Sequence, residues 1–423
     1  MTATPRLQPF RPAFGPDLEA RICASLILAR AIRSVSQGLL VVDFTLYLNA
    51  LGWSAAAIGG LLASALAVQA GLTLLAGPLS DHWGRRRFLL AYELLLIAAA
   101  ALSLASTASW AIAAAAIMGG FGRGMNGAAG PFAPVEQAWL ARVTPFTYRG
   151  KIFSLNTALG SFGMGLGALL AATPALWQQW LPGAAAYRPL FGVVLISALA
   201  TGFLVFRLTD TRGDAAEEAI SAPLRHEENR RLINIAWINA LNGAGIGLVG
   251  PLMAYWFHLR FGLGPAHIGP MMATGFVATG CTALAAGRFV HRHGMVTTVV
   301  AMRSFGLLFL LLLPFAPTFT VGAVLYILRA ACTRGTAGAR QALNMSLVSD
   351  ARRGLAATVS ALSMQLPRTV GPIVAGAAFG AGYLTAPFLA AAALQGASIA
   401  LYRVIFRKYE AAVSDKHRKM RSG

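Results

Sequence analysis

Two long apolar runs, 56–76 and 88–107, flank one short polar segment, and this pattern restricts the possible fold more than any other feature. The polar segment carries Asp81 and three consecutive arginines, Arg85, Arg86 and Arg87. A hydrocarbon core of about 30 Å requires about 20 apolar residues in each spanning helix. Because Lys and Arg collect in cytoplasmic loops, the pattern predicts two membrane-spanning helices joined by a cytoplasmic turn.

The overall composition indicates the same class. Apolar residues make up 57% of the 423 residues, charged residues only 12%, and the mean hydropathy is +0.62. Soluble domains carry about twice this charge fraction. A net charge of +20 would fit a nucleic-acid-binding protein. Here, however, the basic residues lie in short loops between apolar runs, so we expect membrane topology to explain them and no nucleic acid to bind.

The apolar runs predict an all-α integral membrane protein with twelve spanning helices. Alternate connections are rich or poor in arginine, which predicts that both termini are cytoplasmic in a plasma membrane of the bacterial inner-membrane type. We expect a tail at 1–22, a six-helix half at 23–208, a linker at 209–231, a second half at 232–406 and a basic tail at 407–423. The expected helices are 24–50, 56–76, 88–107, 110–140, 152–173, 189–208, 232–257, 267–289, 295–315, 319–346, 354–378 and 384–406.

The two halves repeat several short patterns in the same order. The spacing Gly77-x6-Gly84 returns as Gly287-x6-Gly294, although His291 stands where the first half has Asp81. Arg123-Gly124-x-x-Gly127 likewise returns as Arg334-Gly335-x-x-Gly338. Parallel repeats of this kind are known from transporters built of two six-helix halves.

The polar segment also resembles a family signature. Its spacing, Gly77-x-Leu79-x-Asp81-x-x-Gly84-Arg85-Arg86-Arg87, is similar to the loop between helices 2 and 3 of the major facilitator superfamily. The resemblance implies two parallel six-helix halves and a secondary transporter that works by alternating access. It also implies a cytoplasmic gate in which Asp81 faces the start of helix 11 and Arg85 reaches Glu136. The gate residues are then Gly77, Asp81, Gly84, Arg85 and Glu136.

Charged residues inside the spans are costly and therefore informative. For those near helix ends, among them Glu93, Glu136 and Arg303, the simpler interpretation is that the side chain extends to the interface. By the resemblance, helices 1, 4, 7 and 10 line the cavity. This implies a substrate cavity with Arg33, Asn239, Asn242, Arg329 and Arg334. The arginines either face the cavity and favour anions, or bind carbonyl groups and helix dipoles.

Asp43 is the candidate for proton coupling. It is set in the apolar stretch Leu39–Thr45 of helix 1, where burial disfavours a charged carboxyl and a nearby arginine favours it. Arg123, which matches the helix-4 Arg-x-x-x-Gly element of proton-coupled family members, is the expected partner. By helix rise, about 9 Å of depth separates the two. The alternative is an Asp43 that caps a break in helix 1 or faces an outer vestibule.

The expected function is proton-coupled export of small amphipathic or drug-like compounds. Alternatives are transport of a small organic anion and a transporter-like sensor without turnover. We expect no enzyme activity, since the seven histidines lie in loops or tails, and no cofactor or metal. The expected partners are a small-molecule substrate, protons and membrane lipid, with the protein itself monomeric.

Overall fold

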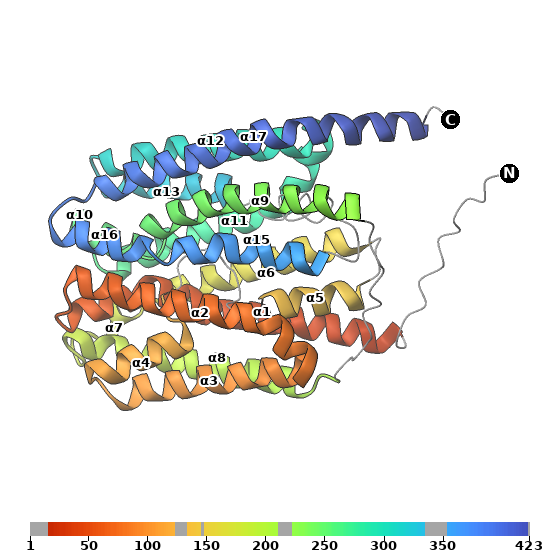
Figure 1. The fold of residues 1–423 in the computed structure, drawn as a ribbon. Helices are drawn as coiled ribbons and strands as arrows, with labels where there is room; N and C mark the ends of the chain where they lie inside the picture. Colours follow the sequence, from red (N-terminus) through yellow and green to blue (C-terminus); the bar gives the residue numbers. More distant parts are fainter. Residues whose placement is uncertain (1–15, 123–132, 145–147, 210–221, 335–352, 422–423) are drawn as a thin grey trace.

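The computed structural model describes residues 16–122, 133–144, 148–209, 222–334 and 353–421. Within these ranges, nine helical segments are long and apolar enough to cross a membrane. Three further expected crossings, the fourth, tenth and eleventh (110–140, 319–346 and 354–378), are built from shorter helices or adjoin residues outside the described ranges. The fold is all-helical there, and the total of twelve crossings stays a prediction. In Figure 1 the helices run side by side, and α1 begins at the same end of the bundle where α17 finishes.

The first half contains the helices that precede residue 210. It consists of α1 (Pro16–Ala50), α2 (Ala55–Trp83), α3 (Arg85–Ala105), α4 (Ser109–Gly119), α5 (Ala133–Val143), α6 (Arg149–Leu170), the short α7 (Pro174–Trp177), η3 (Gly183–Tyr187) and α8 (Arg188–Phe206). Helix 1 therefore begins at Pro16 and not near residue 24, so part of the predicted tail at 1–22 is helical.

The second half follows the linker. It consists of α9 (Ala222–Val249), α10 (Met253–Phe261), α11 (Pro265–His293), α12 (Met295–Leu312), η4 (Leu313–Phe315), α13 (Phe319–Arg334), α15 (Arg353–Arg368), α16 (Gly371–Gly380) and α17 (Ala386–Arg421). The helix α9 already begins at Ala222, so residues 222–231 of the predicted linker at 209–231 are helical. The predicted tail at 407–423 is helical as far as Arg421.

The internal repeat predicted from the glycines is visible at the helix turns. Gly84 separates α2 from α3 with φ 92°, and Gly294 separates α11 from α12 with φ 84°. Both values lie in the left-handed region, which glycine adopts without a steric penalty. The same sharp turn therefore occurs at the same place in each half.

Close helix packing also repeats between the halves. A Cβ added to Gly38 would lie 2.0 Å from the Met164 carbonyl oxygen, and one added to Gly243 would lie 2.1 Å from that of Met364. These glycines allow the backbones of α1 and α6, and of α9 and α15, to touch. Small residues at helix interfaces serve this purpose in membranes, where apolar side chains gain little from leaving lipid.

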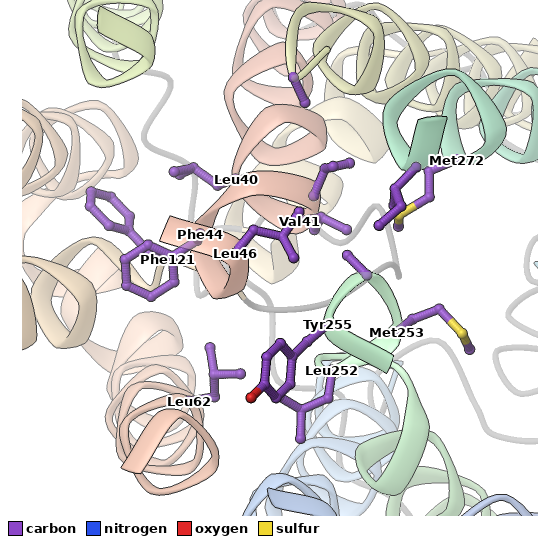
Figure 2. Close-up of a cluster of buried hydrophobic side chains, with 14 of the residues drawn as sticks. Leu40, Val41, Phe44, Leu46, Leu62, Phe121, Leu252, Met253, Tyr255 and Met272 are labelled. Atoms are coloured by element: carbon purple, nitrogen blue, oxygen red, sulfur yellow. The ribbon is translucent and has the colours of Figure 1, made fainter. Parts of the chain in front are cut away.

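The two ends of the bundle differ in how the halves meet. We call the end with loops 51–54, 262–264 and 381–385 the closed end, and the opposite end, where α1 begins and α17 finishes, the terminal end. At the closed end one buried cluster contains residues of both halves. Figure 2 shows part of this seam, with Val41 of α1 on the side of Met272 of the second half, while Phe44 lies beside Phe121 of the first half.

Toward the terminal end the clusters are separate. Among the described residues, one buried cluster runs from Ile22 to Leu208 within the first half, and two others contain residues of the second half alone. The halves thus share their apolar core at one end and keep separate cores at the other. This is the packing expected of two rigid halves that can rock about the closed end.

Candidate functional site

Helix 4 is interrupted where the sequence predicted a continuous helix at 110–140. The helix α4 ends at Gly119, and Gly120 and Gly122 have φ of 63° and 67°. The three carbonyl groups before the break accept hydrogen bonds from other helices: Gln69 Nε2 donates to the oxygens of Ile117 and Met118, and Tyr92 Oη donates to that of Gly119.

The interruption is therefore satisfied by protein groups. A non-helical backbone at membrane depth needs such partners, and interrupted helices mark substrate and ion sites in transporters. Gln69 and Tyr92 were not predicted as site residues. The Gly119-Gly120-Phe121-Gly122 run in an otherwise helical stretch was the signal that could have located the break.

Asp43 comes directly before Phe44, which packs against this interruption. The ring of its neighbour Phe44 packs edge-on against Phe121 with centroids 5.6 Å apart, and Phe121 stacks on Phe191. Asp43 itself is 3% exposed, and neither carboxylate oxygen has a hydrogen-bond partner among the described residues. A charged carboxylate is expensive in such surroundings.

The structure excludes a capping role for Asp43. The helix α1 is continuous from Pro16 to Ala50, so Asp43 cannot cap a break in it, and its burial keeps it out of a solvent-filled vestibule in this conformation. Arg123, the predicted partner, lies outside the described residues. Gly122 is the last described residue before the gap at 123–132, and a Cβ added to it would lie 3.2 Å from the Phe44 ring. Gly122 is thus next to the turn of α1 that contains Asp43 and Phe44.

Arg33 is the centre of a buried charge cluster. Its guanidinium binds Glu93 at 2.5 and 2.9 Å and Glu136 at 2.5 Å. Thr201 on α8 donates to the other Glu93 oxygen at 2.9 Å, so four helices meet here. Arg33 is 2% exposed and Glu93 1%.

This cluster corrects two expectations. Glu93 and Glu136 do not extend to the membrane interface, because both are buried. Arg33 does not offer an unpaired positive charge to the cavity, because Glu93 and Glu136 both bind it. Both partners are far away in sequence, which is why the spacing alone did not reveal them.

The second half has a related contact at the equivalent position. Arg303 on α12 donates to Asn242 Oδ1 on α9. Arg303 stands 210 positions after Glu93, so the second half has an arginine where the first half has a glutamate. Asn242 therefore binds an arginine in this conformation. Asn239 donates to Ser360 Oγ at 3.0 Å, which joins α9 to α15. Helix 7 is interrupted between Val249 and Met253, where the sequence predicted one helix at 232–257.

Arg329 and Arg334, the two arginines predicted for the cavity in the tenth crossing, both lie on α13. Arg329 is buried, and its Nε has no hydrogen-bond partner within the described ranges. Arg334 lies over the ring of Phe276, with its Cζ 5.3 Å from the centroid, a distance typical of a cation–π contact. The whole stretch 232–406 contains a single acid, Asp350.

The predicted gate is described only in part. Gly84 forms the turn between α2 and α3, and Arg85 is the first residue of α3. Gly77 and Asp81 belong to α2, but their surroundings lie outside the described set. Glu136, the predicted partner of Arg85, binds Arg33. The contact of Asp81 with helix 11 stays a prediction.

A polar contact joins the halves at the closed end. His258 Nδ1 lies 3.0 Å from the Leu263 carbonyl oxygen and therefore donates to it. The opposite nitrogen, Nε2, is then free to accept from Asn49 Nδ2 at 3.4 Å, while Tyr255 Oη donates to Asn49 Oδ1 at 3.3 Å. Asn49 belongs to α1 and the other two to α10, so this contact exists only while the closed end is closed.

Comparison with known proteins agrees with this architecture. The family model of the major facilitator superfamily matches residues 26–237, which is half of the chain. The chain belongs to the major facilitator superfamily. It is therefore a membrane transport protein, as the resemblance implied.

Individual relatives are distant. An uncharacterized membrane protein of Saccharomyces cerevisiae is 22% identical over 84% of this chain and 87% of its own length. The solved structure of the D-xylose-proton symporter matches with a TM-score of 0.69 and 15% identity, covering 91% of this chain and 97% of that one. The human organic anion transporter MFSD10 matches with a TM-score of 0.65 and 18% identity, covering 91% and 99%. At these identities the structures share the fold, and their different substrates do not identify the one carried here.

Proposed function

We propose that this family member is a secondary active transporter that exports small amphipathic or drug-like compounds in exchange for protons. It resides in the plasma membrane with the terminal end in the cytoplasm. The observation that carries the proposal is Asp43: a carboxyl buried in an apolar part of helix 1, without a described hydrogen-bond partner, next in sequence to Phe44, which packs against the interruption of helix 4.

Such a carboxyl suits a proton carrier. In the closed-end conformation its apolar surroundings favour the neutral, protonated form. A proton taken up from outside, while the closed end is open, is held in this form after that end closes. Water or Arg123 that then reaches the carboxyl from the terminal end favours release of the proton into the cytoplasm, as exchange against an exported compound requires. Leu39, Phe44 and Phe121 are buried in the core cluster of this region, and such apolar side chains would suit a compound with a large apolar part once the closed end opens.

The packing of the two halves supports alternating access. The shared cluster at the closed end and the separate clusters at the terminal end fit a conformation that admits substrate from the cytoplasm. Opening the other side requires the seam at the closed end to part, together with the contact of Asn49 with Tyr255 and His258.

The test is transport by purified protein in liposomes. With only a pH gradient imposed, the wild type should concentrate a fluorescent amphipathic dye, whereas Asp43→Asn should not. The same variant should still exchange dye against dye at equal pH, because exchange needs no net proton movement. Ser36→Ala, which changes another buried polar residue of α1, should preserve both activities. Gradient-driven accumulation by Asp43→Asn would refute the proposal, and a wild type without any transport would favour the sensor alternative.

A second candidate function, transport of a small organic anion, is favoured by the pair Arg329 and Arg334. These arginines lie on a cavity helix within the stretch 232–406, which contains a single acid, and the Phe276 ring beside Arg334 could contact an aromatic anion. Competition of small aromatic carboxylates with the bound dye, lost in Arg334→Gln, would support this candidate. If dye binding is changed neither by the carboxylate nor by Arg334→Gln, transport of an organic anion is ruled out.

A further inference from the structure

A groove lies between α12 and α17, away from the residues discussed above. These two helices run side by side at one edge of the bundle (Figure 1). The groove has a volume of about 700 Å³ and lies wholly within the two spanning segments. It is lined by Val300, Ser304 and Leu307 of α12 and by Gly396, Ala400 and Arg403 of α17, among others.

The deep part of the groove exists because one position lacks a side chain. An atom added as Cβ to Gly396 would already lie 3.4 Å from Leu307, so a larger residue would fill the space. From Gly396 the groove runs along α17 toward the terminal end and reaches Arg403 about 10 Å farther on, at 1.5 Å per residue. The walls are apolar apart from the Ser304 hydroxyl and Arg403.

Arg403 sets the chemistry of the groove mouth. It is exposed near the last membrane residue of the α17 segment, Phe406, and has no acidic partner in the part of the chain that the structure describes. A lone arginine facing lipid is costly unless an anion or the interface reaches it. Beyond it, residues 407–421 add six basic residues against Glu410 and Asp415, so the whole region attracts anionic headgroups.

We propose that this groove is a binding site for one anionic phospholipid, whose acyl chain lies against Gly396 and Leu307 and whose phosphate binds Arg403. Only lipid or another membrane helix can reach a groove at this depth. The combination of an apolar floor with a single cation at the mouth matches a lipid, which carries its charge at one end.

The test compares phosphatidylglycerol with phosphatidylcholine of the same acyl chains. Purified full-length protein in a neutral detergent is titrated with each lipid, and retained lipid is counted by native mass spectrometry. We expect the wild type to retain one phosphatidylglycerol preferentially. Arg403→Gln should weaken that retention about fivefold, the contribution of one basic residue near an anionic surface. Arg292→Gln, which removes an exposed charge at the same end but outside the groove, should leave it unchanged.

A second variant separates the groove from general charge attraction. Ala400→Phe places a ring in the groove at an exposed position and retains Arg403. It should reduce retention of phosphatidylglycerol as strongly as Arg403→Gln does. Equal weakening by Arg403→Gln and Arg292→Gln would overturn the proposal, because attraction would then be non-specific. Unchanged retention in Ala400→Phe, or a dimer whose formation excludes the lipid, would also overturn it.

Discussion

Gly59 and Gly60 form a matched pair of positions that tests whether the closed end controls the conformation. A Cβ at Gly59 would lie 2.2 Å from the Pro372 carbonyl oxygen and 3.1 Å from Gly376 Cα, whereas a Cβ at Gly60 would have nothing within 4 Å. Gly59 lies on α2 and its two neighbours on α16, so this contact joins the halves. Gly59→Ala should therefore penalise the closed seam, and Gly60→Ala should not.

The magnitude follows from the distance. Ordinary van der Waals contact begins at 3.4 Å, so the carbonyl oxygen and the new methyl group must separate by 3.4 − 2.2 = 1.2 Å. Neither partner is a flexible side chain, so the helices themselves must move apart. Overpacking of this kind costs about 1–3 kcal/mol. If it falls on one conformation only, it changes the balance of two conformations by roughly 5-fold to 150-fold.

The assay is the rate at which a buried reporter becomes reactive. Met272 is fully buried in the seam and visible in Figure 2. Met272→Cys is therefore introduced after Cys23, Cys281 and Cys332 are replaced by alanine. Maleimide should label the reporter at least about fivefold faster in Gly59→Ala than in Gly60→Ala. Equal labelling rates in the two variants, with both proteins folded, would show that the Gly59 contact does not hold the halves together.

Three further predictions address the charge cluster, the gate and the topology. Arg33→Met should lower stability by about 3–5 kcal/mol, because Glu93 and Glu136 are buried and both lose the guanidinium that binds them. Adding Glu93→Gln and Glu136→Gln should recover part of that loss; thermal denaturation measures both, and a further decrease would contradict the reasoning. Asp81→Asn should impair transport, measured as liposome uptake, while membrane fractionation should show normal insertion. Full transport activity of this variant would contradict the role of Asp81 in the gate. A reporter fused at residue 423 should be cytoplasmic and one near residue 108 external, and opposite results would reverse the predicted orientation.

The class of the fold could be predicted from the sequence because it depends on local features. Apolar runs indicate spans through their length, and the turns at Gly84 and Gly294 were visible as a repeated glycine spacing. The interruption of helix 4 could not be seen in hydropathy, since Gly119-Gly120-Phe121-Gly122 is itself apolar. Its stability depends on Gln69 and Tyr92, which approach only after helices 2, 3 and 4 have packed.

The site was predicted less completely for a similar reason. Arg33 is 60 residues from Glu93 and 103 from Glu136, and helix spacing does not say which faces of three helices will meet. The sequence therefore identified the costly buried groups but not their pairing. Asp43 was located correctly as a buried carboxyl on helix 1, and its partner in transport stays a prediction.

The unequal distribution of acids between the halves has an electrical consequence. The first half surrounds Arg33 with two carboxylates, whereas Arg303, Arg329 and Arg368 are buried in a half whose stretch 232–406 contains only Asp350. Any movement of the second half along the membrane normal therefore carries net positive charge through the transmembrane field. One charge crossing a full 100 mV exchanges about 2.3 kcal/mol, so a displacement through a quarter of the field exchanges about 0.6 kcal/mol. At that displacement, each such arginine would make the ratio of the two conformations change by about threefold per 100 mV.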